Sequence, residues 1–247
     1  MIVVSQGPTK SGTTLAFEMA CATLELHGWP QRKLPDGVVT EGHHINFLDR
    51  WDNAALLALV DETRGERIVV KTHGPPTLSP ALVDRLIADG ELRIHLVVRD
   101  PRDQVLSVLD AGRAARAEGS ASFSQIETID DALFQVHRQL ARTRAWGSRA
   151  SLRLVYDHFA FDRPAGPCLI AADLEVAPDV DGVWALVDGR FTQKNVARPL
   201  RYRSELEPAE AARIAAEFPD LIGRVIEAGD FGWFDEAPFV DDQPPLP

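Results

Sequence analysis

A glycine-rich turn near the start of the chain has the residue types of a phosphate-binding loop. A short apolar run leads into QGPTKSGTT (residues 6–14), and a helical pattern follows it. Such a turn presents backbone N–H groups and a helix N-terminus to an anion. The spacing from Gly7 to Gly12 matches the start of a nucleotide-triphosphatase loop, but Thr13 occupies the position of that loop's lysine. The lysine lies earlier, at Lys10, and the alternative interpretation is a surface turn that exposes it.

A second group of polar residues, Lys71-Thr72-His73, ends the next apolar run of the chain. On extended backbone, residues i and i+2 share a face, so the side chains of Lys71 and His73 point the same way. A histidine beside a lysine suits the removal of a proton from an acceptor while the cation stabilises charge on a transferring group. The alternative is a histidine held by ordinary loop contacts before two prolines.

A third group begins at Arg99, directly after another apolar run. Asp100 and Pro101 are typical of a helix N-cap and first turn, and Asp103 and Ser107 fall on the same helix stripe as Asp100. Arginine and serine can meet on one phosphate, because a planar guanidinium binds phosphate through two hydrogen bonds. The alternative is that Arg99 pairs with Asp103 and that Ser107 is an ordinary helix residue.

The elements that position these groups alternate along the chain. Strands are expected at residues 2–4, 67–71, 92–98 and 152–156, and helices at residues 13–27, 54–63, 80–89 and 130–146. This alternation predicts an α/β fold with a central parallel sheet, helices on both faces and ligands at the carboxyl ends of the strands. We expect a single three-layer domain over residues 1–240, with a P-loop-containing nucleotide-binding fold, followed by an acidic, proline-rich tail at residues 241–247.

Together, the three motifs resemble those of the sulfotransferases that use 3′-phosphoadenosine 5′-phosphosulfate (PAPS). The similar segments are residues 8–14, 71–73 and 99–107, which have the family's order and spacing, and the resemblance covers about residues 1–210. It implies the transfer of a sulfuryl group from PAPS to a hydroxyl or amine of a small-molecule or natural-product acceptor. The product nucleotide would be 3′,5′-adenosine bisphosphate (PAP), and no metal would be required.

The resemblance also implies roles for single residues. His73 would be the general base, and Lys10 and Lys71 would stabilise charge on the transferring group. The implied donor-binding residues are Lys10, Ser11, Gly12, Thr13, Thr14, Arg99, Ser107, Tyr156, Phe191, Arg198 and Arg201, with Arg203 as a further candidate. The segment in which the family builds its acceptor pocket contains His43, His44, Phe47 and Trp51.

Two features of the family are missing from this sequence. No Arg-Lys-Gly triplet is present, so the arginines at positions 198, 201 and 203 are the candidates for the remaining 3′-phosphate contact. Leu15 stands where the family has a tryptophan that stacks on adenine. The adjacent His43 and His44 have no third ligand at matching spacing, so no metal site is expected.

The composition and charge of the chain argue against several classes of binding partner. A net charge of −11 argues against a general nucleic-acid binder. The longest apolar runs are too short for a membrane helix, and the first residues lack the regions of a signal peptide. With only two cysteines in 247 residues, a disulfide framework is excluded. These observations predict a cytoplasmic protein with a small-molecule acceptor and no membrane or nucleic-acid partner, and they leave the oligomeric state open.

Two other functions remain possible on the sequence alone. A P-loop kinase that phosphorylates a small metabolite with Mg-ATP would need a lysine after Gly12 and an acidic residue at a strand end. The sequence has Thr13 at the first position, and the strand ends carry Lys71-Thr72-His73 and Arg99. A non-catalytic nucleotide-binding module is the other alternative, because the Arg-Lys-Gly triplet is missing.

Overall fold

The computed structural model describes residues 1–190 and 197–239 of the chain. In chain order, its elements are β1 (Ile2–Gln6), α1 (Thr13–Leu26), β2 (Trp51–Asp52), α2 (Asn53–Glu62), β3 (Ile68–Thr72), β4 (Pro76–Thr77), α3 (Pro80–Ala88), β5 (Leu92–Val98), α4 (Pro101–Glu118), α5 (Ile129–Ala145), η1 (Gly147–Arg149), β6 (Leu152–Val155), α6 (Tyr156–Phe161), α7 (Ala165–Asp173), α8 (Val180–Arg190), α9 (Tyr202–Glu205), α10 (Pro208–Glu217), η2 (Leu221–Glu227) and α11 (Gly232–Asp235).

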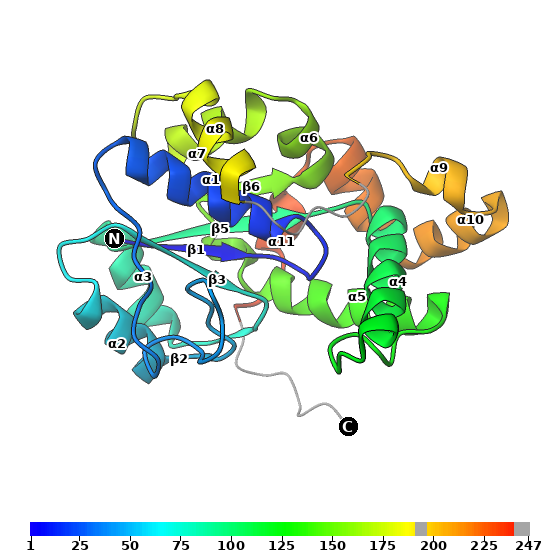
Figure 1. Cartoon of the computed structure of the whole chain (residues 1–247), viewed down its shortest axis with the longest axis horizontal. Coiled ribbons are helices and arrows are strands. Elements are labelled where there is room, and N and C mark those ends of the chain that lie inside the picture. The colour runs from blue at the N-terminus through cyan, green and yellow to red at the C-terminus, as the bar shows by residue number, and fades with distance from the viewer. Residues whose placement is uncertain (191–196, 240–247) are drawn as a thin grey trace.

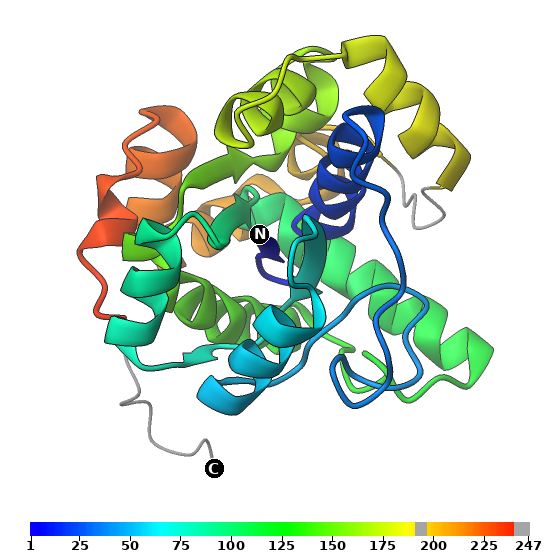
Figure 2. The same cartoon turned by 90° about the vertical axis from the view of Figure 1, so that its left-hand side faces the viewer.

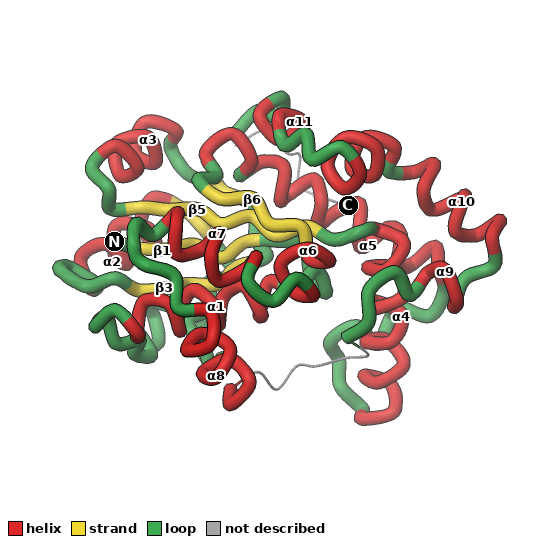
Figure 3. The backbone as a smooth tube through the Cα atoms, turned by 90° about the horizontal axis from the view of Figure 1, so that it is seen from above, coloured by secondary structure: helices red, strands yellow, loops and turns green. Residues whose placement is uncertain are grey.

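A four-stranded parallel sheet lies at the centre, in the order β3-β1-β5-β6 (Figure 3). The central strand β1 pairs Ile2 with Ile68 on one side and with Leu92 on the other. The short strands β2 and β4 form a separate parallel pair. Because the four main strands run the same way, the residues that follow them meet at one edge of the sheet.

Helices cover both faces of this sheet, as the alternation of the sequence predicted. Val4 and Val70 point into one core with residues of α2, α3 and α5, and Val3 and Val69 point into a second core with residues of α1, α7 and α8. Figure 1 shows α1, α7 and α8 above the sheet and α2 and α5 below it, and Figure 2 shows the same two layers from the side. The chain is an α/β protein with a three-layer arrangement.

Local signals in the sequence explain where several elements begin. The side chain of Asp100 accepts a hydrogen bond from the Arg102 N–H (2.9 Å), and Pro101 opens α4. Gly119, at φ 68°, ends the same helix. One boundary differs from the expectation: β6 ends at Val155, and Tyr156 begins α6 instead of ending the strand. The backbone therefore turns at Tyr156, which brings its ring over the loop after β1.

Candidate active site

The loop between β1 and α1 follows a path that only small residues allow. Gly12 is the N-cap of α1 in the left-handed conformation (φ 93°), where glycine is favoured. A Cβ atom on Gly12 would lie 2.2 Å from Cδ2 of Tyr156, and one on Gly7 would lie 2.4 Å from the carbonyl oxygen of Val97. The loop is therefore packed closely between the ends of β5 and β6, and its shape depends on both glycines.

Two glutamines fix the middle of this loop. The side-chain oxygen of Gln139, on α5, accepts hydrogen bonds from the backbone N–H and from the hydroxyl of Thr9 (2.7 Å for the hydroxyl). The amide nitrogen of Gln104, on α4, donates to the carbonyl of Thr9 (2.9 Å). Sequence reasoning did not identify either glutamine. The position of Gln104 within the Arg99 motif was a usable signal, whereas nothing in the sequence links Gln139 to a loop 130 residues away.

The hydroxyl-bearing residues of the loop occupy its inner side. The Ser11 hydroxyl donates to the carbonyl of Pro8 (2.7 Å) and lies 3.1 Å from that of Thr13. Ser11 and Thr13 are buried, and Thr14 is half-buried in the first turn of α1. The N-cap residue Gly12 has no side chain, and the structure shows no side-chain cap for this helix among the described residues. The positive end of the helix dipole therefore faces the loop and favours an anion there.

Two lysines meet at the carboxyl edge of the sheet. Lys71, near the end of β3, is 7% exposed, and burial lowers its pKa to about 8, with a further contribution from the nearby charge of Lys10. Lys10 is half-buried, and burial also lowers its pKa, while Arg99 acts in the same direction. A second charged neighbour of Lys71 is Glu18 of α1, whose own pKa is raised by burial. The site therefore holds two lysines for which the nearby carboxylates, Asp110 for Lys10 and Glu18 for Lys71, only partly offset the effect of burial.

His73 lies beside these lysines with one ring nitrogen held by the loop. Its Nδ1 atom is 2.6 Å from the carbonyl oxygen of Gly7. A carbonyl can only accept a hydrogen bond, so Nδ1 carries the proton and Nε2 keeps its lone pair. Burial, reinforced by the charge of Lys71, lowers the pKa of His73 to about 3. The imidazole is therefore neutral at physiological pH and can accept a proton at Nε2.

The loop before β2 supplies an aromatic wall to the same place. Phe47 forms a parallel bridge with Lys71, and the Leu48 N–H donates to the Lys71 carbonyl (2.9 Å). The ring centroid of Phe47 is 5.6 Å from that of His73 and 4.4 Å from that of His43. The structure thus brings Phe47 and His43 next to His73, and His44 is exposed on the same loop.

Arg99 lies beside the loop, in a setting with few polar partners. Its guanidinium stacks on the ring of Tyr156 (4.6 Å to the centroid) and is 3.5 Å from a carboxylate oxygen of Asp103. Its Nε atom is buried and has no hydrogen-bond partner among the described residues. The pairing with Asp103 that the sequence left open is therefore present, but it is long and leaves the guanidinium partly unsatisfied. Ser107 is buried further along α4, on the helix that starts after Arg99.

The arginines near position 200 are engaged with carboxylates of the chain itself. Arg201 is 3% exposed and binds Asp110 (2.8 Å) and Glu205 (2.7 Å). Arg198 is exposed and binds Glu205 as well (2.7 Å). Arg203 is exposed beside the ring of Tyr202. A phosphate contact from any of them stays a prediction, and Phe191, the expected adenine neighbour, lies outside the described residues.

Three further features concern the expected adenine contact, a buried carboxylate and metal binding. Leu15, in place of an adenine-stacking tryptophan, is buried in the core beneath α1. Asp157, which follows Tyr156, has one buried carboxylate oxygen without a hydrogen-bond partner among the described residues, and burial raises its pKa to about 6. Within residues 1–190 and 197–239, no three His, Cys, Asp or Glu side chains gather in a group that could hold a metal ion.

No protein-family model matches the sequence, and no curated protein matches it significantly. Solved structures do match. Retinol dehydratase in complex with androsterone and the inactive cofactor PAP has a TM-score of 0.53 at 15% identity, with 89% of this chain and 80% of that chain covered.

Two other structures are similar at lower scores. Retinol dehydratase with retinol and PAP has a TM-score of 0.49 at 16% identity, with 89% and 80% of the two chains covered. A sulfotransferase from Alicyclobacillus acidocaldarius has a TM-score of 0.40 at 18% identity, with 90% and 95% covered. We base the fold assignment on the first match alone. With its parallel sheet order β3-β1-β5-β6 and helices on both faces, the chain has the α/β fold of retinol dehydratase.

Proposed function

We propose that the protein is a PAPS-dependent sulfotransferase that acts on a hydroxyl or amine of a small-molecule acceptor. The observation that carries this proposal is the meeting of Lys10, Lys71 and a neutral His73 beside a phosphate loop. The motif resemblance to PAPS-dependent sulfotransferases supports it, as does a protein of the same fold that was crystallised with PAP.

The residues present fit an adenosine bisphosphate. The uncapped start of α1 provides N–H groups for a 5′-phosphate, and the half-buried Lys10 provides a counter-charge. The buried Nε of Arg99 has no partner among residues 1–190 and 197–239, so an anion that reached its guanidinium would supply a missing hydrogen-bond acceptor. Residues 10–14 would hold the 5′ side, and Arg99 and Ser107 the 3′-phosphate, with Tyr156 beside Arg99.

When bound, PAPS supplies the sulfuryl group, which passes to the acceptor oxygen or nitrogen as the bond from sulfur to the 5′-phosphate oxygen breaks. His73 accepts the acceptor's proton at Nε2, because Nδ1 is committed to the Gly7 carbonyl. Lys10 and Lys71 stabilise the negative charge that grows on the leaving phosphate oxygen. No metal is needed in this scheme, since the two lysines supply the positive charge.

Burial is the main cause of the low pKa of His73, and the charge of Lys71 lowers that pKa further. An anion placed next to Lys71 would offset the second of these effects, and the pKa of His73 would rise. A base whose pKa rises as the site fills is better matched to proton transfer near neutral pH.

A kinase that uses Mg-ATP is the second candidate, and particular residues oppose it. Thr13 stands where the kinase loop needs its lysine, and β3 ends in Lys71-Thr72 and not in a carboxylate for magnesium. A non-catalytic nucleotide-binding module is the third candidate. The tautomer of His73 favours an enzyme over such a module. Its unprotonated Nε2 can act as a base, and a module that only binds a nucleotide needs no base.

The proposal extends to partners and location. We propose a cytoplasmic enzyme with a small-molecule acceptor and with neither a membrane nor a nucleic-acid partner. No helix in the described part of the chain has both the length and the apolar character that a bilayer crossing requires.

Calorimetric titration with PAP, beside ATP and Mg²⁺, tests the proposed function. We expect selective binding of PAP, with at least a tenfold loss of affinity in Arg99→Ala, because a hydrogen bond to a charged group contributes about 1.5–3 kcal/mol. Arg85→Ala, on the exposed side of α3, is the matched control and should bind PAP like the wild type. Preference for Mg-ATP would instead favour the kinase.

A further inference from the structure

Lys10 has a backbone conformation that is unfavourable for lysine. Its φ is 66°, in the left-handed region, where a side chain crowds the backbone and glycine is the usual residue. Gly12 of the same loop also has a positive φ, but it has no side chain to crowd. A residue with a side chain keeps such a conformation only where its surroundings hold it, and such residues cluster at ligand sites. The contacts that hold Lys10 therefore bear on its function.

The peptide group before Lys10 is fixed by glutamine side chains from two helices. Nε2 of Gln104, on α4, donates to the carbonyl oxygen of Thr9 (2.9 Å), which belongs to that peptide group. Oε1 of Gln139, on α5, accepts from the hydroxyl of Thr9 (2.7 Å) and from its backbone N–H. Both glutamines are buried. Every polar group of Thr9 is thus bound by one of these two side chains.

The peptide group after Lys10 is fixed by the loop itself and by Arg99. The Ser11 N–H donates to the carbonyl of Pro8 (3.3 Å), and the guanidinium of Arg99 donates to the carbonyl of Lys10 (3.4 Å). These two bonds are longer than the bonds that the glutamines form with Thr9. Because φ and ψ of Lys10 set the angle between its two peptide groups, the shorter bonds are the stronger constraint on its conformation.

The ammonium group of Lys10 lies near the other cations of the proposed site. Its charge lowers the pKa of Lys71, and the charge of Arg99 lowers its own pKa. Asp110 attracts it, but Asp110 also binds Arg201 (2.8 Å). A lysine on an unconstrained surface loop would extend into water, where its charge is fully hydrated. The half-buried position of Lys10 therefore follows from the direction in which the loop backbone presents it.

We propose that Gln104 and Gln139 are positioning residues for Lys10: they hold the left-handed turn that directs its ammonium group to the leaving phosphate oxygen. This inference rests on the proposed sulfotransferase function. Without the two glutamines, the loop relaxes to an ordinary backbone conformation, and the Cα–Cβ bond of Lys10 points elsewhere. The stabilisation of the leaving group by Lys10 is then lost, because it requires a charge that is held in place before the reaction.

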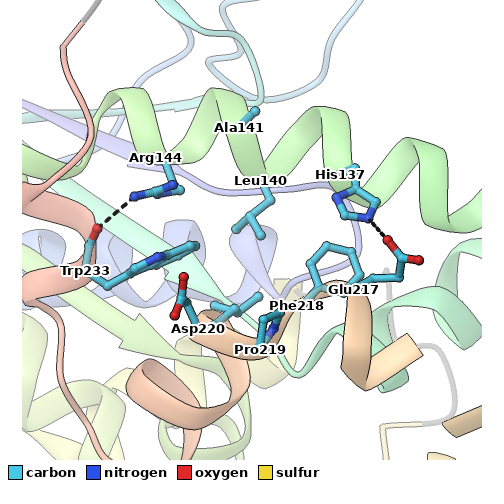
Figure 4. Close-up of a pocket in the computed structure, with 10 residues that line it drawn as sticks. His137, Leu140, Ala141, Arg144, Glu217, Phe218, Pro219, Asp220 and Trp233 are labelled. Atoms are coloured by element: carbon cyan, nitrogen blue, oxygen red, sulfur yellow. Dashed lines mark hydrogen bonds and ion pairs between the residues drawn. The ribbon is translucent and has the colours of Figure 1, made fainter. Parts of the chain in front are cut away.

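Other residues of α5 face a separate pocket and provide a control. His137 and Arg144 line this pocket, and Figure 4 shows His137 beside Glu217 and Arg144 beside Trp233. Gln139→Met removes the amide and keeps a side chain of similar length. His137→Met is the matched control, because it introduces the same side chain on the same helix without changing a contact of the loop.

Nuclear magnetic resonance tests the positioning without a donor or an acceptor. The protein is labelled with lysine that carries 13C at Cε, the signal of Lys10 is assigned with Lys10→Arg, and its pKa is measured by titration. We expect a pKa below the ordinary value of 10.5 in the wild type and in His137→Met. In Gln139→Met the pKa should return to about the ordinary value, because the released lysine reaches water. Gln104→Met should have the same effect from α4, and thermal unfolding checks that each variant is folded.

Turnover with PAPS and an accepted phenol supplies a double-mutant cycle. We expect Gln139→Met to lower turnover at least tenfold and Lys10→Ala to lower it by about 10²–10³-fold. In the Lys10→Ala background, Gln139→Met should lower turnover no further, because it acts through the lysine. A glutamine that merely supports the loop would lower turnover in both backgrounds, since Ser11 and Thr13 belong to the same loop.

An unchanged pKa of Lys10 in both glutamine variants, or a full loss of turnover on top of Lys10→Ala, would overturn the positioning role. The two proposals fail separately. A wild type without turnover or PAP binding rejects the sulfotransferase, whereas the titration of Lys10 still shows whether the glutamines hold it.

Discussion

His73 is the residue on which the chemistry of the site depends most. The Gly7 carbonyl fixes its proton on Nδ1, and burial beside Lys71 keeps it neutral. These two contacts leave a single unprotonated nitrogen for the acceptor. The same contacts connect the base to the phosphate loop, so the substitution that tests the base must preserve the loop.

His73→Asn meets this requirement, because its side-chain amide can still donate to the Gly7 carbonyl. We expect turnover to fall by about 10²–10⁴-fold, which is the usual contribution of a general base. PAP affinity should be unchanged. The measurement is the rate of PAP release from PAPS with an accepted phenol, and His137→Asn, on the exposed side of α5, is the control. Undiminished turnover in His73→Asn would remove the base assignment.

At the scale of elements, the start of α1 is shaped by its contact with Tyr156. Gly12 needs a left-handed backbone and has no space for a Cβ atom, because the ring of Tyr156 lies over it. The glycine therefore serves two purposes: it permits the turn, and it lets the aromatic ring at the start of α6 approach the loop.

Gly12→Ala separates these two purposes when it is compared with Gly28→Ala. Gly28 also has a positive φ (82°), but a Cβ there would meet nothing within 4 Å. We expect Gly28→Ala to lose about 1 kcal/mol of unfolding free energy from backbone strain alone. Gly12→Ala should lose more, and it should also lose PAP affinity. Denaturant unfolding and calorimetry measure both effects, and equal losses in the two variants would contradict the role of the Tyr156 contact.

The four main strands and the helices of the first two-thirds of the chain could be predicted from the sequence, because their signals are local. The apolar run at residues 92–98 and the cap formed by Asp100 and Pro101 gave β5 and the start of α4 with little error. The contacts between distant segments could not be predicted. Gln139 binds Thr9 across 130 residues, and no periodicity or spacing records such a polar contact. The sequence could name candidate residues that lie in compact motifs. It could not name residues that reach the candidate site from distant helices.

The arginine at position 201 illustrates the same limit. As a residue type it suited a phosphate, and its place in the sequence suggested that role. The fold instead surrounds it with Asp110, from α4, and Glu205, from α9. A carboxylate 91 residues away in the sequence competes for the same guanidinium, so sequence reasoning could identify the charge but not its partner.

On the scale of the whole molecule, an acidic protein concentrates buried cations at one edge of its sheet. The net charge is −11, yet Lys10, Lys71 and Arg99 are gathered at the carboxyl ends of β1, β3 and β5. Burial of a charge without full compensation lowers the stability of the folded state. The proposed anion site is therefore a place where the fold is less stable than it would be without these cations.

Lys71→Met measures this cost. The pKa of Lys71 is about 8 in the folded chain, below its ordinary value of 10.5. At pH 7 the lysine is charged in both states and its burial is unfavourable, so we expect the variant to be more stable by about 2–3 kcal/mol. Between pH 8 and pH 10.5 only the unfolded chain keeps the proton, which stabilises the wild-type fold as pH rises.

The advantage of Lys71→Met should therefore shrink over that interval of pH, whereas turnover should be lost at every pH. Denaturant unfolding at pH 7 and at pH 9.5 gives the comparison, and Lys33→Met, on the exposed surface, is the control. A variant that is less stable than the wild type at pH 7 would contradict the account of uncompensated burial.

The hydrogen bond from His73 to Gly7 also gives the protein an internal reporter. The Nδ1 atom of His73 lies 2.6 Å from the Gly7 oxygen. A ring proton in such a short hydrogen bond, sheltered by burial, exchanges slowly with water and resonates far downfield of the amide protons. Gly7 begins the phosphate loop, so any ligand that shifts the loop will move that single resonance. Occupation of the nucleotide site can thus be followed by nuclear magnetic resonance through one proton, without a label on the ligand and before any acceptor is identified.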